Sequence, residues 1–151
     1  MGLGLSMLVA ATSILAVNSA PPDPASKTFA NEATIITHLM FDLDLKAFTR
    51  QYSSLRRENK TLDWSTDGCS APLIGDSGRS FNFRWPCLRH DFGYRNFKSR
   101  GLFNTEMRQR VDDRFRRDLD ESCEPKQRTF KVRCLAWAEI FLTAVRAAGG
   151  S

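Results

Sequence analysis

The chain has 151 residues, which is enough for one domain with a hydrophobic core. Its 42% hydrophobic and 26% charged residues exclude a disordered chain and indicate a folded globular protein. The net charge of +5 favours acidic partners. Because the arginines are spread along the chain without a basic arm or a nucleic-acid-binding motif, we expect the partner to be an anionic lipid surface and not a nucleic acid.

An apolar segment opens the chain. Residues 3–17 are almost wholly apolar, no charged side chain precedes Asp23, and the small residues Ser19 and Ala20 precede two prolines. The segment is too short to span a membrane comfortably, which takes about 20 residues. The pattern therefore predicts a secretory signal peptide over residues 1–20, although basic residues are missing from its start. We expect residues 21–29 to be a short propeptide or flexible segment and residues 30–151 to form the folded domain.

The residues that follow are typical of helices separated by one long loop. Apolar side chains at helical spacing predict two short packing helices over residues 31–41 and 45–57. Prolines and glycines between residues 70 and 86 indicate a loop. Pro86 suits the first turn of a third helix, and Gly101 is suited to end that helix.

Two further helices complete the chain. Asn104 or Thr105 is a suitable cap for a fourth helix. Its apolar stripe consists of Met107, Val111, Phe115 and Leu119. After Pro125, a long amphipathic helix is predicted by the spacing of Phe130, Cys134, Trp137, Phe141 and Val145. No segment alternates as a strand does, so the predicted fold class is all-α.

Cysteine usage indicates an exported protein. The four cysteines contain no Cys-x-x-Cys pair and the chain has only two histidines, which disfavours a zinc site and favours disulfides. Of the three possible pairings, the nearest-neighbour scheme closes two short loops. Asn59-Lys60-Thr61 is an acceptor sequence for N-linked glycosylation if the chain enters the secretory pathway.

A histidine and a carboxylate stand side by side in the predicted third helix. His90 is the type of side chain best suited to take up a proton near neutral pH. The adjacent Asp91 could hold a hard cation such as calcium close to that base. The alternative is a packed core histidine beside a solvated aspartate.

Two motifs in order make the first interpretation much more specific. Asp63-Trp64-Ser65-Thr66-Asp67-Gly68-Cys69, followed after a loop by Cys87-Leu88-Arg89-His90-Asp91-Phe92-Gly93-Tyr94-Arg95-Asn96-Phe97, resembles the paired signature of small secreted bacterial and fungal phospholipases A2. The resemblance extends from about Ala25 to the C-terminus. It implies a small disulfide-linked helical bundle in which a calcium-binding loop precedes the catalytic helix. It also implies the pairs Cys69–Cys87 and Cys123–Cys134.

The resemblance further implies a set of site residues. Asp67 and Asp91 would supply carboxylates to Ca2+, and Gly68 a backbone carbonyl. His90 would act as general base on a water molecule that attacks the sn-2 ester of a glycerophospholipid. The family usually has a larger residue at the position of Gly68, which predicts a more flexible loop here and no gain in calcium affinity.

The base also needs an acceptor that orients its ring, and the fourth helix offers Asp112 and Asp113. At about 100° per residue, Asp112 flanks the apolar stripe whereas Asp113 points close to the opposite side. The family's orienting aspartate also aligns with Asp112, although the spacing from His90 is one residue longer than usual. The alternative is an ordinary ion pair of Asp112 with Arg108 or Arg116.

Other residues carry weaker functional signals. Tyr94 could line the site or simply pack in the core, and His38 has no carboxylate motif around it. Ser77 lacks the Gly-x-Ser-x-Gly pattern of a serine hydrolase. Arg79 and Arg84, with Trp85 as an exposed aromatic side chain, are candidates for contact with a membrane surface.

These observations predict a secreted, calcium-dependent phospholipase A2, expected to be a monomer, that releases a fatty acid and a lysophospholipid. One alternative is a noncatalytic secreted protein that uses the same scaffold to bind membranes or a receptor. Another is a basic host-defence protein that disrupts membranes, which calcium chelation would distinguish from the enzyme.

Overall fold

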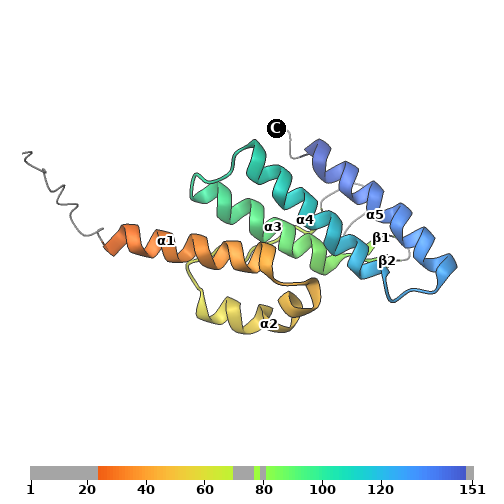
Figure 1. Ribbon diagram of the computed structural model, residues 1–151, viewed down its shortest axis with the longest axis horizontal. Coiled ribbons are helices and arrows are strands. Elements are labelled where there is room, and N and C mark those ends of the chain that lie inside the picture. The colour runs from red at the N-terminus through yellow and green to blue at the C-terminus, as the bar shows by residue number, and fades with distance from the viewer. Residues whose placement is uncertain (1–23, 70–76, 79–80, 149–151) are drawn as a thin grey trace, which may run out of the picture.

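The computed structural model describes residues 24–69, 77–78 and 81–148. The predicted signal peptide and the predicted cleavage point lie outside these residues. Figure 1 shows a helical protein in which α3, α4 and α5 run side by side and α2 lies at the edge away from α5. The elements are α1 (Pro24–Thr37), the π-helix η1 (His38–Asp42), α2 (Leu45–Glu58), β1 (Ser77–Gly78), β2 (Phe81–Asn82), α3 (Arg84–Ser99), α4 (Thr105–Cys123) and α5 (Arg128–Ala148).

The helices enclose two hydrophobic clusters. The first joins α1, η1, α2 and α3 and includes Leu39, Phe48 and Phe92. The second joins α3, α4 and α5 and contains all four cysteines. The predicted all-α class is confirmed, and none of the described helices combines the length and apolarity that a membrane span requires.

Side-chain caps fix the start of two helices. The Asp44 carboxylate accepts a hydrogen bond from the Ala47 N–H and caps α2 (2.5 Å). Asn104 accepts from the Met107 N–H (2.8 Å), so Asn104 and not Thr105 is the cap of α4. The helix predicted over residues 31–41 begins earlier, at Pro24, and its last turn is the wider π-helix η1.

The segment expected to be a loop between residues 70 and 86 contains one short ladder. Ser77 pairs with Asn82 and Gly78 with Phe81 in an antiparallel ladder of two-residue strands. Strands of this length are too short for alternation to be visible in a sequence. The ladder leads Phe81 into the second cluster, where it is 6% exposed.

Gly93 on α3 lies directly against the side chains of Met40 and Val111. A Cβ atom at Gly93 would lie 2.7 Å from Met40 Cε and 3.2 Å from Val111 Cγ1. Such distances are below van der Waals contact, so a larger residue would force the Met40 side chain to move and would crowd Val111.

Arg89 is a fully buried cation that links α3 to two neighbouring elements. Its guanidinium donates to the carbonyls of Leu39 (2.6 Å) and Leu43 (2.5 Å) around η1, and to Asp118 Oδ1 on α4 (3.3 Å). Burial lowers the pKa of Arg89 to about 10, although Asp118 opposes this shift. Burial also raises the pKa of Asp118 to about 6 against the pull of Arg89 and Arg114. Within the described residues, Asp118 Oδ2 has no hydrogen-bond partner.

Replacing Arg89 should therefore destabilise the fold strongly. We expect Arg89→Met to lower the free energy of unfolding by about 3–5 kcal/mol, because the Leu39 and Leu43 carbonyls lose their donor and the buried Asp118 keeps only Arg114 as a partner. The double variant Arg89→Met with Asp118→Leu should recover part of this loss. Arg110→Met is the matched control, since Arg110 also lies over an aromatic ring but is exposed. Urea unfolding followed by circular dichroism measures each value, and equal small losses at both arginines would contradict the assignment.

Candidate active site

His90 and Tyr94 on α3 share one hydrogen-bond partner, the Oδ1 atom of Asp112 on α4. His90 Nε2 lies 2.9 Å from Asp112 Oδ1 on α4, and the Tyr94 hydroxyl donates to the same oxygen (2.8 Å). His90 and Tyr94 are four residues apart, so they lie on one face of α3. The imidazole also packs against Phe115, with the ring centroids 4.8 Å apart. These contacts fix the orientation of the imidazole.

The protonation states of this group follow from its surroundings. Burial raises the pKa of Asp112, but hydrogen bonds from His90 and Tyr94 and the charge of Arg108 outweigh it, so the pKa is lowered. Burial and the Asp112 carboxylate raise the pKa of Tyr94 to about 12, so its hydroxyl remains a donor. An ionised Asp112 favours the imidazole tautomer with hydrogen on Nε2. Nδ1 is then the nitrogen that can accept a proton.

The two adjacent aspartates of α4 have different environments. The Asp112 side chain is 5% exposed, whereas the Asp113 side chain is 45% exposed and pairs with Arg146 (3.0 Å). The inward direction predicted for Asp112 therefore agrees with the structure. Arg108 Nε also lies 3.9 Å from Asp112 Oδ2, so the ion pair proposed as an alternative exists alongside the contact with His90. Arg116 pairs with Glu139 instead.

A disulfide brings the Asp67 segment to the start of α3. Cys69 and Cys87 are bonded, with their Cα atoms 5.1 Å apart. Thr66 donates its hydroxyl hydrogen to Asp91 Oδ2 (2.5 Å) and accepts from the Gly68 N–H (3.0 Å). Gly68 has a φ of +71°, in the left-handed region that favours glycine, which gives a physical reason for the small residue at this position.

The second disulfide lies away from this segment. Cys123 at the end of α4 is bonded to Cys134 on α5. Both cysteine pairs implied by the family resemblance are therefore confirmed.

Asp67 and Asp91 lie close enough to affect each other's ionisation. Burial raises the pKa of Asp91 to about 6 and the charge of Asp67 adds to the rise, although Thr66 opposes it. Burial also raises the pKa of Asp67, but a backbone hydrogen bond and Arg95 outweigh it, and the net shift is downward. Arg95 Nη2 lies 3.2 Å from Asp67 Oδ1. A divalent cation would relieve the repulsion between the two carboxylates.

The donor set fits a hard cation that also accepts backbone and water oxygens. Within residues 24–69, 77–78 and 81–148, no group of three or more His, Cys, Asp or Glu side chains could hold a metal ion. Calcium held here by Asp67 and Asp91 would therefore need backbone oxygens such as the Gly68 carbonyl, together with water.

One pocket of about 360 Å³ collects most of the predicted site residues. It is lined by Asp67, His90, Asp91, Tyr94, Arg95 and Lys98. Asp112 is not among the lining residues and contacts His90 Nε2 from α4. Arg95 and Lys98 also line the pocket, although the sequence motifs did not indicate them as site residues. Their positions four and seven residues after Asp91 place them on the same face of α3, so helical periodicity could have indicated them.

The remaining candidates lie elsewhere or are differently exposed. The His38 side chain is 54% exposed and pairs with Asp42 on η1 (3.0 Å). The expectation that Trp85 is an exposed membrane contact is wrong, because Trp85 is half-buried and packs edge-on against Tyr52, 5.5 Å between centroids. Arg84 is exposed, whereas Arg79 and the side chain of Ser77 lie outside the described residues.

Comparison with known proteins identifies the family of this chain. The family model described as prokaryotic phospholipase A2 matches residues 36–149. A secretory phospholipase A2 of Arthroderma benhamiae is 32% identical over 152 residues, which cover 99% of this chain and 93% of the relative. A secretory phospholipase A2 of Beauveria bassiana is 34% identical over 90 residues, covering 60% of this chain and 45% of that protein. With a matching family model over most of its length and a relative aligned nearly end to end, the chain belongs to the prokaryotic phospholipase A2 family.

Proposed function

We propose that this phospholipase A2 is secreted and calcium-dependent, and that it hydrolyses the sn-2 ester of glycerophospholipids to a fatty acid and a lysophospholipid. The observation that carries the proposal is the contact of His90 Nε2 with the buried Asp112 beside a pocket that contains Asp67 and Asp91. Secretion is supported by the two disulfides, which are typical of oxidising compartments, and by the apolar segment at the start of the chain.

His90 is proposed as the general base. Its Nδ1 would take a proton from a water molecule while the water oxygen attacks the ester carbonyl carbon. Asp112 accepts the Nε2 hydrogen bond, which would hold the tautomer and stabilise the imidazolium that forms. The imidazolium would then return the proton to the leaving glycerol oxygen, so that the base is regenerated.

Asp67, Asp91 and the Gly68 carbonyl are proposed to hold the calcium ion. When bound, calcium would supply a Lewis acid that polarises the ester carbonyl and neutralises the charge developing on its oxygen. Arg95 and Lys98 line the same pocket and give it a positive wall that suits the phosphate of the substrate.

The overall proposal is tested by fatty-acid release from vesicles labelled separately at the sn-1 and sn-2 positions. We expect release from sn-2 in calcium and none in chelator. Release from sn-1, or full activity in chelator, would contradict the regiospecificity or the calcium dependence. A protein that binds the vesicles without releasing fatty acid in either condition would instead be the noncatalytic binding protein.

The role of Asp112 can be separated from that of its neighbour. We expect Asp112→Asn to lower kcat by a factor on the order of 10² to 10⁴, as loss of an orienting aspartate does in other enzymes. Asp113→Asn should leave kcat near that of the wild type, because the Asp113 side chain faces solvent. Initial rates on a monomeric short-chain phospholipid make the comparison, with circular dichroism as the check on folding. Equal losses in two folded variants would refute the assignment.

Replacing a calcium ligand should lower the affinity for calcium without lowering the stability of the fold. We expect a wild-type dissociation constant on the order of 10⁻⁴ to 10⁻³ M, typical of extracellular calcium modules. Asp67→Asn and Asp91→Asn should each weaken calcium binding in titration calorimetry while leaving the melting temperature without calcium nearly unchanged. Unchanged affinity in both variants would rule out this site.

Arg95 should compete with calcium for Asp67. Its guanidinium lies 3.2 Å from a proposed ligand oxygen, so its removal should make the carboxylate more available. We expect Arg95→Gln to tighten calcium binding by roughly three- to tenfold for a pair that is partly screened by solvent. Lys98→Gln is the matched control, because Lys98 lines the same pocket and the charge change is equal. Calorimetry without substrate gives both constants, and an equal gain in both variants would reduce the effect to general electrostatics.

A further inference from the structure

The start of α5 exposes large apolar side chains among cations. Four large hydrophobic residues are exposed in the described part of the chain, and three of them lie on α5. Two of these, Phe130 and Val132, fall within the first five residues of the helix, with 51% and 65% exposure. Single exposed apolar residues are common on protein surfaces, so it is the surroundings of this pair that carry the argument.

Basic side chains surround the two apolar residues. Lys126, Arg128 and Arg133 are exposed, and within the described ranges none of the three forms an ion pair. The nearby Glu124 is paired with Lys131 (2.7 Å). We call residues 126–133 the α5 tip. The acids of the neighbouring α4–α5 groove include Glu139, which is paired with Arg116.

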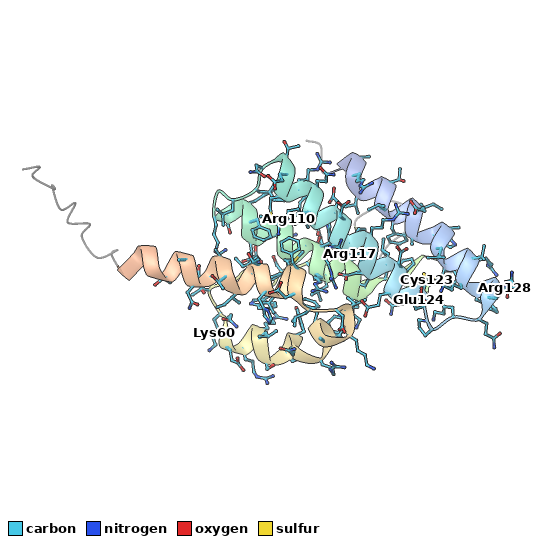
Figure 2. The ribbon with its side chains drawn as sticks, in the orientation of Figure 1. Lys60, Arg110, Arg117, Cys123, Glu124 and Arg128 are labelled. Carbon is cyan, nitrogen blue, oxygen red and sulfur yellow. A yellow bond between two sulfur atoms is a disulfide. The ribbon has the colours of Figure 1, made fainter. Side chains whose placement is uncertain are left out.

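Helix geometry directs these side chains away from the rest of the protein. Each Cα–Cβ bond in a helix is tilted toward the N-terminus, so side chains in the first turn lean past the helix end. Figure 2 shows Arg128 at the extreme end of the molecule, beyond Glu124 and Cys123. The α5 tip is therefore a projecting helix end with exposed apolar and cationic side chains around its axis, and Phe130 and Val132, two residues apart, point to different sides of the helix.

The chemistry of this surface fits one kind of partner. An aromatic ring enters the boundary between headgroups and acyl chains, and flanking cations are attracted to anionic headgroups. We propose that the α5 tip docks on anionic phospholipid surfaces, as an attachment point separate from the His90 pocket. This deepens the proposed function and rests on it for the choice of lipid. The pocket residues lie on α3 and the Asp67 segment, with α4 packed between α3 and α5 (Figure 1), so the tip can bind without filling the pocket.

Vesicle binding without turnover tests the proposal. All proteins carry His90→Asn and are measured in chelator, by sedimentation with phosphatidylglycerol or phosphatidylcholine vesicles. Because each cation near an anionic surface raises affinity by about fivefold, Arg128→Glu with Arg133→Glu should weaken binding to phosphatidylglycerol at least tenfold. The matched control is Arg50→Glu with Lys60→Glu, which changes the net charge equally at exposed positions on and just after α2. Lys60 lies well away from Arg128, beneath α1 (Figure 2).

A separate pair of variants tests the apolar part of the α5 tip. We expect Phe130→Ser to weaken binding at high salt, where charge attraction is screened, and Leu102→Ser, another exposed apolar residue, to have little effect. Equal losses in the two charge-reversal pairs would overturn the proposal. A tip variant that binds vesicles normally but shifts the elution volume on gel filtration would also overturn it, in favour of self-association.

The same variants with His90 restored separate the tip from the proposed activity. Turnover of a monomeric short-chain phospholipid should be unchanged, which also shows that the fold and the pocket are intact. Vesicle binding that depends on the α5 tip, without any hydrolysis, would contradict the proposed function and support the docking role of the tip. Hydrolysis together with vesicle binding that is unchanged in the tip variants would support the proposed function and contradict the docking role of the tip.

Discussion

Two consecutive residues of α3 determine how that helix sits on α4. Arg89 reaches the buried Asp118 and His90 reaches the buried Asp112. Sliding or rotating one helix against the other would break both contacts, and each buried carboxylate would keep only its partner on α4 itself, Arg114 for Asp118 and the more distant Arg108 for Asp112. Tyr94 adds a third contact to the same helix. The polar contacts between α3 and α4 therefore also orient the imidazole of His90.

The Asp67 segment is linked to α3 by a covalent bond. Cys69 is joined to Cys87 in the first turn of α3, three residues before His90. Thr66 then bridges to Asp91, and the left-handed backbone at Gly68 turns the chain between these two contacts. The segment is thus anchored at several points to the helix that carries His90. Opposite charges meet there, because Arg95 on that helix contacts Asp67.

The excess positive charge of the chain has different consequences at different places. In the core, Arg89 is satisfied by carbonyls and a carboxylate and serves packing. Around the pocket, Arg95 and Lys98 offset two carboxylates. At the α5 tip, Lys131 is paired with Glu124, whereas the exposed Lys126, Arg128 and Arg133 form no ion pair among the described residues and lie near apolar side chains. The net charge of +5 is therefore distributed over three different environments. Only the exposed cations attract partners over a distance comparable to the screening length.

The amino-acid sequence by itself determined the helical class, most helix ends and the two motifs, because helical periodicity, caps and motif spacing are local properties. It also favoured Asp112 over Asp113, since the direction of a side chain on a helix follows from its position. Only the tertiary structure decided which distant groups meet. Three contacts join residues that are far apart in the sequence. They are Arg89 with the Leu39 carbonyl of η1, Arg95 with Asp67, and Trp85 with Tyr52. Such contacts depend on how whole elements pack, and no local pattern encodes that packing.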